Sequence, residues 1–163
     1  MLIIYSGGEK LMLRRILSGG QTGVDENSLR AAKFCGFETG GWLPKNCWTL
    51  NGSRPDLLVE YNMKESNLGY AGRTEKNVKD SDGTIRIAED FSSSGEKCTL
   101  AAIKWFNKPH LDIDIKNPKE KEEVLSWIKE NNIKTLNIAG NSEKTSPGIG
   151  DFAFNYLVRI FQS

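Results

Sequence analysis

Short apolar runs alternate with amphipathic stretches along most of the chain. Residues 15–20 predict a short buried strand that ends in glycines. The residues that recur at helical spacing after this strand are Val24, Ser28, Ala31, Ala32 and Cys35. Gly36 then stands where a helix commonly ends. This stretch predicts a strand, a glycine-rich turn and a helix in direct succession.

The alternation continues toward the C-terminus. The pattern predicts a helix over 73–80, a strand over 83–89, a helix over 92–106, a strand over 109–115, a helix after Pro118, a strand over 135–139 and a final helix from 147. Asn117–Glu120 resembles a capping box with proline at the first helical position.

Strands that alternate with helices indicate βαβ units. The expected fold class is α/β, a single Rossmann-like three-layer domain over 14–163 with a mostly parallel sheet. Residues 1–13 are expected to be an N-terminal extension or an extra strand. Residues 37–72 show no clear periodicity, and so long an irregular stretch in a compact domain is typical of a functional loop.

Composition and charge narrow the classes of protein. The 22 basic and 21 acidic residues leave a net charge of +1, so we expect neither nucleic-acid nor membrane binding. Cys35, Cys47 and Cys98 form no CxxC pair, and His110 is the single histidine. We therefore expect no disulfide, no structural metal site and a cytoplasmic location. Glycine is enriched, with 16 residues.

The first glycine-rich turn is Ser18–Asp25, between the first strand and the first helix. Glycines let the backbone approach a ligand, and the N–H groups of a helix N-terminus attract anions. We expect an anion-binding cradle made of Ser18, Gly19, Gly20, Gln21, Thr22, Gly23 and Asp25. A structural turn is the alternative. Serine replaces the first glycine of the dinucleotide fingerprint, so NAD is not expected.

Two further turns follow predicted strands. Ser92–Thr99 contains the candidate ligand residues Ser94, Gly95 and Thr99, although a flexible serine loop would look the same. Gly140 opens the third turn, which continues to Gly150. Because the carboxyl ends of parallel strands share one edge of the sheet, we expect all three turns to meet there and bind one ligand.

Several single residues have both a functional and a structural interpretation. Lys45 and Arg73 are candidate partners of an anion, or solvated surface charges. Trp42 and His110 are more typical of structural positions. Cys98 is either a thiol of lowered pKa at a helix N-terminus or a small buried apolar residue. Asp112 and Asp114 share one strand face, which solvent would explain. No catalytic set stands out, which favours binding over turnover.

At this point several motifs resemble one known group. They are Ile16–Asp25, Thr39–Lys45, Tyr70 with Arg73–Val78, Ser81–Thr84, and Asn137–Gly140 with Ser146–Ile149. In combination they are similar to the putative molybdenum carrier family, which resembles the molybdenum cofactor carrier proteins. That family belongs with the Rossmann-like proteins once labelled lysine decarboxylases, including the cytokinin-activating phosphoribohydrolases.

The resemblance implies a homo-oligomer that carries a small anionic ligand, either molybdenum cofactor of the molybdopterin type or molybdate. Molybdoenzymes that receive the cofactor would then be partners. In this interpretation Gly19–Gly23 form the main phosphate-binding cradle. Lys45 and Arg73 contact the ligand, with Thr74 and Asn77 nearby.

The chain departs from this group at the second turn. Relatives carry a Gly-Gly-Thr loop there, whereas this chain has Glu96, which would repel a phosphate unless it pointed away. The phosphoribohydrolases also carry a glutamate after this loop, which Leu100–Ala102 replace, so glycosidic hydrolysis by their route is disfavoured. No lysine context for pyridoxal phosphate is present. The alternatives are a nucleotide or nucleoside-phosphate hydrolase, in which Asp25 or Glu75 acts as acid or base, and a nucleotide-sensing module.

Overall fold

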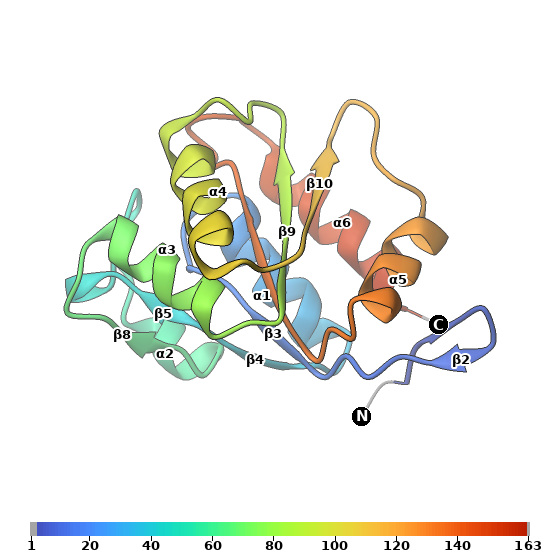
Figure 1. Cartoon of the computed structure of the whole chain (residues 1–163). Coiled ribbons are helices and arrows are strands. Elements are labelled where there is room, and N and C mark those ends of the chain that lie inside the picture. The colour runs from blue at the N-terminus through green and yellow to red at the C-terminus, as the bar shows by residue number, and fades with distance from the viewer. Residues whose placement is uncertain (1–2, 163) are drawn as a thin grey trace.

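The computed structural model describes residues 3–162. A five-stranded parallel sheet forms its centre, in the order β10 (His110–Asp114), β9 (Gly83–Ala88), β11 (Thr135–Gly140), β3 (Arg15–Leu17) and β4 (Glu38–Gly40). Figure 1 shows the sheet between two layers of helices. The predicted α/β class with a parallel, Rossmann-like sheet is confirmed.

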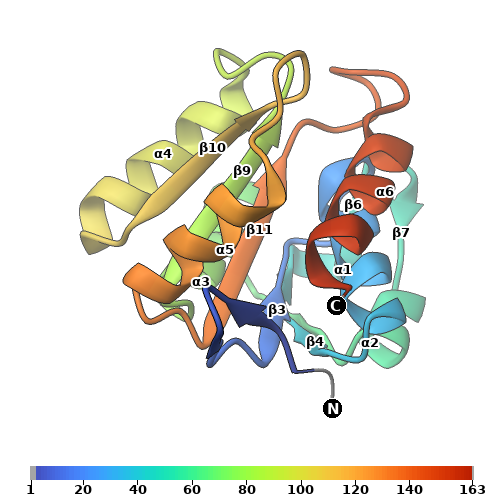
Figure 2. The same cartoon turned by 90° about the vertical axis from the view of Figure 1, so that its right-hand side faces the viewer.

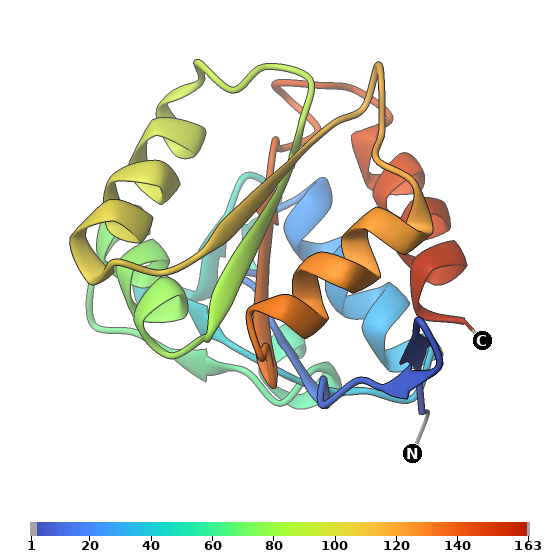
Figure 3. The same ribbon diagram turned by 45° about the vertical axis from the view of Figure 1, so that its right-hand side comes forward.

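Helices α1 (Val24–Phe34), α5 (Lys121–Glu130) and α6 (Ile149–Phe161) cover one face of the sheet. Helices α3 (Tyr70–Lys79) and α4 (Ser94–Phe106) cover the other, as Figures 2 and 3 show from two further directions. The order of the strands reverses direction beside β3, because β4 lies on one side of it and all later strands lie on the other. Open α/β sheets bind ligands beside such a reversal.

The two faces of the sheet differ in polarity. Ile85, Ile87 and Ile138 point into the main core with α1, α5 and α6 and are almost fully buried. On the opposite face, toward α3 and α4, the sheet carries the buried polar residues Thr84, Arg86 and Asn137. Register places Asn137 beside Thr84, and its Nδ2 donates to the Thr84 hydroxyl at 3.2 Å. A buried polar face is costly to build, which makes the α3–α4 side the candidate for a functional site.

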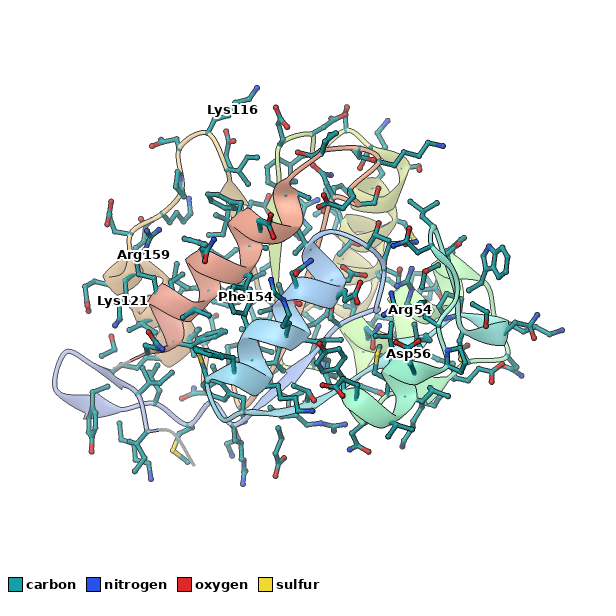
Figure 4. The ribbon with its side chains drawn as sticks, turned by 180° about the vertical axis from the view of Figure 1, so that it is seen from behind. Arg54, Asp56, Lys116, Lys121, Phe154 and Arg159 are labelled. Carbon is teal, nitrogen blue, oxygen red and sulfur yellow. The ribbon has the colours of Figure 1, made fainter. Side chains whose placement is uncertain are left out.

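Residues 37–72 are more ordered than the sequence predicts. This stretch contains the edge strand β4, the short strands β5 (Trp42–Leu43), β6 (Trp48–Thr49), β7 (Gly52–Ser53) and β8 (Lys64–Glu65), the 3₁₀ turn η1 (Lys45–Cys47) and helix α2 (Asp56–Glu60). Strands of two or three residues are too short to show a periodic pattern, so the prediction of an irregular loop is wrong here. Figure 4 shows Arg54 and Asp56 side by side; Arg54 also pairs with Glu26 of α1 at 3.0 Å, which fixes α2 against the main domain.

Two predicted helix starts also need correction. Helix α3 begins at Tyr70, three residues before the predicted start. Helix α5 begins at Lys121 with Glu120 as its N-cap, so the capping box and the proline at the first helical position are wrong. Asn117 instead continues a turn in which its N–H bonds the carbonyl of Asp114.

The N-terminal segment forms a small hairpin of β1 (Tyr5–Ser6) and β2 (Glu9–Lys10). Residues 1 and 2 of the expected extension lie outside the described residues. Ile4, Leu11 and Leu13 around the hairpin are buried in the main core. Among residues 3–162, no helix has the length and apolar character needed to span a bilayer.

Candidate functional site

A cavity of about 620 Å³ opens at the carboxyl edge of the sheet, on its polar face. Segments from all three turns line it, together with α3. The lining residues are Gly19, Gln21, Asp25, Leu50, Tyr70, Ala71, Arg73, Thr74, Asn77, Ser93, Ser94, Gly95, Glu96, Cys98, Thr99, Asn137, Ala139, Gly140, Asn141, Ser142, Lys144 and Thr145. The volume is typical of sites that hold an organic small molecule.

Arg73 and Asp25 form a buried ion pair in the wall of this cavity. Arg73 Nη1 lies 3.3 Å from Asp25 Oδ2 and donates to the carbonyl of Gly19 at 2.6 Å. A side chain at Gly19 would collide with the guanidinium group, so glycine is required where α3 meets the first turn. Burial raises the Asp25 pKa to about 6, although Arg73 and the N–H groups of Gln21 and Gly140 oppose the shift. Burial likewise lowers the Arg73 pKa, since the cost of desolvation exceeds the attraction of the pair.

The N-terminus of α4 faces the cavity. Ser93 is its N-cap, and its hydroxyl accepts a hydrogen bond from the Glu96 N–H at 3.4 Å. The N–H groups of Ser94 and Gly95 have no acceptor among the described residues. Two free amides at the positive end of a 13-residue helix can bind an anion.

Glu96 lies in the first turn of α4 and is 2% exposed. Burial is the main reason that its pKa rises to about 8, and the negative charge of Asp25 adds to the effect. The side chain is therefore mostly uncharged at pH 7, so it does not repel an anion in the way that its sequence position suggests.

At the third turn, side chains of the protein already accept hydrogen bonds from the free backbone N–H groups. Glu143 accepts hydrogen bonds from the N–H groups of Gly148 and Gly150, at 3.0 and 2.7 Å, so its carboxylate already occupies the N-terminus of α6. Asn141 Oδ1 accepts from the N–H groups of Glu89 and Asp90, which ties the end of β9 to the end of β11. This turn therefore shapes the cavity, and the helix behind it is not a free anion site.

Comparison with known proteins shows the family of this chain. A sequence profile described as the circularly permutated YpsA SLOG family matches residues 16–161, nearly the whole chain. The chain belongs to this family.

The structure of this chain is also similar to the crystal structure of a "Putative molybdenum carrier protein" from Syntrophus aciditrophicus SB. The TM-score is 0.85 and the sequence identity is 33%, over 95% of this chain and 98% of that chain. The resemblance to the putative molybdenum carrier family is thus confirmed. A comparison with curated proteins finds no match.

The structure of this SLOG protein brings together ten of the predicted ligand residues at the cavity. They are Gly19, Gln21, Asp25, Arg73, Thr74, Asn77, Ser94, Gly95, Thr99 and Gly140. The Arg73–Asp25 pair is already engaged, as is the Thr99 hydroxyl, which donates to the Gly95 carbonyl at 3.0 Å. Two further side chains are engaged as well. Asn77 pairs with the backbone of Trp42 at 2.8 and 3.2 Å, and Gln21 Oε1 accepts from the N–H groups of Thr22 and Leu50 at 2.9 Å each. Both residues hold the cavity wall in place.

Five other predicted residues do not line the cavity. The Ser18 hydroxyl is buried and donates to the carbonyl of Ile138 at 2.6 Å. Gly20 and Gly23 adopt positive φ angles of 74° and 84° and serve the turn itself. Thr22 accepts from the Glu143 N–H at 3.3 Å. Lys45 is exposed in η1, away from the cavity.

Other single-residue interpretations also change. Cys98 is half-buried in the cavity wall, and burial raises its pKa, which agrees with the apolar interpretation and not with a thiol of lowered pKa. Trp42 is half-buried outside the cavity, where Lys76 lies 4.3 Å from its ring and its Nε1 donates to Asp80. Asp112 accepts a hydrogen bond from Nε of the buried Arg86 at 2.8 Å, so the interpretation of Asp112 as a simple solvent-facing carboxylate is wrong.

Sequence reasoning missed several residues of the wall. Asn137 and Tyr70 appear in the family motifs but were not assigned to the site. Ser142, Lys144 and Thr145 lie within the predicted third turn, of which only Gly140 was assigned to the site. Glu75 is exposed on α3 and does not line the cavity. Among residues 3–162, no group of three or more His, Cys, Asp or Glu side chains is arranged to hold a metal ion.

Proposed function

We propose that the chain binds and carries an anionic, phosphate-containing small molecule, molybdenum cofactor of the molybdopterin type or molybdate, in this cavity. The observation that carries the proposal is the meeting of three strand-to-helix turns around one cavity at the carboxyl edge of a parallel sheet. The similar protein from Syntrophus aciditrophicus SB, described as a "Putative molybdenum carrier protein", supports the choice of ligand.

In this proposal the anionic group lies at the N-terminus of α4. The free N–H groups of Ser94 and Gly95 donate to it, and the helix dipole adds to the attraction. Lys144 supplies a positive charge at the cavity wall, and none of the ion pairs among residues 3–162 includes it. Arg73 is bound to Asp25 and Gly19, so it orders the wall and adds little net charge.

Two lysines allow a direct test of the location. Both Lys144 and Lys45 are exposed, but only Lys144 lines the cavity. We expect Lys144→Ala to weaken binding of molybdopterin and of molybdate by about 3- to 10-fold in calorimetry, with a reduced salt dependence. Lys45→Ala should leave both affinities unchanged. A larger loss of affinity in Lys45→Ala than in Lys144→Ala would place the ligand outside this cavity. The absence of heat with every ligand would refute the proposal.

A thermal-shift screen extends this test to pterins, nucleotides and oxyanions. A ligand at a hundredfold excess over its Kd stabilises the folded protein by about 2.7 kcal/mol. Ligands that raise the Tm of the wild-type protein more than that of Lys144→Ala identify the chemical class that the cavity takes.

A nucleotide hydrolase is the second candidate, favoured by one observation. Asp25 and Glu96 line the same cavity, and their pKa values of about 6 and about 8 would leave one as a base and the other as an acid at pH 7. Release of base or phosphate from a nucleotide panel, lost in Asp25→Asn, would support turnover. Binding of the same nucleotides without release would favour the carrier or sensor role.

A further inference from the structure

Glu96 has an unusual environment within the cavity. Its Oε1 atom is buried and makes no hydrogen bond with any described residue. A buried polar atom without a partner costs stability, and folded proteins contain few of them. The atom lies in a residue of the cavity wall, so a bound ligand can supply the missing partner.

The backbone of Glu96 is held by two hydrogen bonds. Its N–H donates to the Ser93 hydroxyl at 3.4 Å, and its carbonyl accepts from Arg86 Nη1 at 3.2 Å. These bonds keep the residue in the first turn of α4, close to the free amides of Ser94 and Gly95.

The nearest cation does not satisfy the carboxyl group. Arg86 from β9 uses Nε and Nη2 to bind Asp112 of β10, at 2.8 and 2.6 Å, and Nη1 to bind the Glu96 carbonyl. The other charges that act on Glu96 are negative, namely Asp25 from α1, Asp112 from β10 and Asp90 from the loop before α4. Arg73 of α3 is engaged with Asp25.

We infer that Glu96 recognises the organic part of the ligand, by accepting hydrogen bonds from adjacent N–H or O–H groups of a phosphorylated molecule. This inference rests on the proposed function and narrows it. The cavity then takes an organic phosphate that carries hydrogen-bond donors, such as an amino-pyrimidinone edge or neighbouring hydroxyl groups. A bare tetrahedral oxyanion such as molybdate has no such donors at neutral pH.

Size and charge both support an organic ligand. The cavity of about 620 Å³ is within the range of sites for organic molecules. The free amides of Ser94 and Gly95 suit a phosphate, whereas a carboxyl group suits donors, because its ionised form only accepts hydrogen bonds. The first turn of α4 therefore offers both hydrogen-bond donors and an acceptor. This combination fits a ligand that has an anionic group at one end and hydrogen-bond donors on the rest of the molecule.

The two kinds of ligand change the protonation of Glu96 in opposite directions. Donor groups stabilise the ionised carboxylate, so a ligand that provides them releases a proton from Glu96, which is mostly uncharged at pH 7 because its pKa is about 8. A bare oxyanion favours the protonated form, and the proton stays bound. A phosphate group, whose second pKa is about 6, can also release a proton on binding. The release that Glu96→Gln abolishes therefore distinguishes the two kinds of ligand.

Calorimetry at pH 7, in two buffers of different ionisation enthalpy, measures this release. The probes are molybdopterin, guanosine 5′-monophosphate, inosine 5′-monophosphate, ribose 5-phosphate, inorganic phosphate and molybdate. The proteins are the wild type, Glu96→Gln and, as a matched control, Glu75→Gln on the exposed surface of α3.

We expect the donor-bearing phosphates to bind more tightly than inorganic phosphate and molybdate, with proton release that Glu96→Gln abolishes. Glu96→Gln should weaken the donor-bearing phosphates by about 10- to 100-fold and leave inorganic phosphate unchanged, and Glu75→Gln should behave as the wild type. A much higher affinity for guanosine monophosphate than for inosine monophosphate would assign the donors to an exocyclic amine. Equal affinities for both nucleotides and ribose 5-phosphate would assign them to hydroxyl groups.

Two results would overturn the inference while leaving the proposed function intact. One is binding of organic phosphates that Glu96→Gln does not change. The other is molybdate binding as tight as that of every organic phosphate. If Glu96→Gln does not fold, the proton release measured with the wild-type protein decides the matter, and organic phosphates that bind without releasing a proton would overturn the inference. No binding of any probe to the wild type would instead refute both proposals.

Discussion

The Arg73 guanidinium lies 3.3 Å from the Asp25 carboxylate, and this pair joins helix α3 to the first turn of α1 across 48 residues of sequence. Both side chains are at least nine-tenths buried. Because Arg73 also donates to the Gly19 carbonyl, it holds the glycine-rich turn, the helix after it and one wall of the cavity in a single arrangement.

Replacement of Arg73 by methionine should be strongly destabilising. Asp25 would be buried without its cation, and it would either stay charged there or take up a proton far above its ordinary pKa. We therefore expect a loss of about 3–5 kcal/mol in the free energy of unfolding at pH 8. The loss should be smaller at pH 5, where Asp25 takes up a proton. Urea unfolding at the two pH values measures the difference, and Arg73→Met with Asp25→Asn should recover most of the stability. Equal losses at both pH values would contradict this account.

Glu96 should make the protein less stable as the pH rises. Its pKa is about 8 in the folded protein and near 4.5 when unfolded, so between these values the folded state binds more protons. The free energy of unfolding then falls with pH, by at most about 1.4 kcal/mol per unit, and levels off above pH 8.

Measurements between pH 6.5 and 8 isolate this contribution, because Asp25, with a pKa of about 6, titrates mainly below that range. Glu96→Gln should remove the slope and be more stable than the wild type at pH 8. Glu75→Gln should retain the slope. A flat profile for the wild-type protein would show that Glu96 is ionised in the fold.

Asp112 and Asp114 offer a matched pair on one strand. Asp112→Ala leaves the buried guanidinium of Arg86 without its carboxylate, and we expect a loss of about 2–4 kcal/mol in unfolding free energy. Asp114 is exposed and bonds only a neighbouring backbone N–H, so Asp114→Ala should cost about 1 kcal/mol or less. Chemical denaturation of both variants tests the contrast, which similar losses would disprove.

Gly41 occupies a position that other residues cannot take without strain. Its φ is +124°, and a Cβ there would collide with the carbonyl oxygen of Ser18. We expect Gly41→Ala to lower the unfolding free energy by about 2–4 kcal/mol. Gly69 has a φ of −76° and open space around it, so Gly69→Ala should change stability by less than about 1 kcal/mol. An unaltered urea midpoint for Gly41→Ala would contradict this reasoning.

The sequence was sufficient to predict the class of fold and the edge of the sheet where a cavity would form. Parallel strands share a direction, so the turns after β3, β9 and β11 must lie at the same edge of the sheet. The glycine and serine patterns identify those turns in the sequence. Arg73 was recognisable as a charged candidate, although its partner was not. The pairing with Asp25 depends on how α3 packs, which local sequence does not specify.

Other features depend on tertiary contacts that no local pattern contains. The carboxylate of Glu143 fills the N-terminus of α6, and only the course of the loop reveals that this helix end is closed. Arg86 meets Asp112 because β9 and β10 are in a particular register. Lys45 and Lys144 are equally basic in the sequence, yet the fold brings only Lys144 to the cavity.

Asn141 connects the ends of β9 and β11 through hydrogen bonds to Glu89 and Asp90. These bonds form within the protein, so the rim of the cavity is set before any ligand arrives. Association then needs little loop ordering and can proceed at a rate close to that of simple encounter. The lifetime of the complex would in turn be determined by the contacts made inside the cavity, so changes there would alter how quickly the cargo leaves and not how quickly it enters.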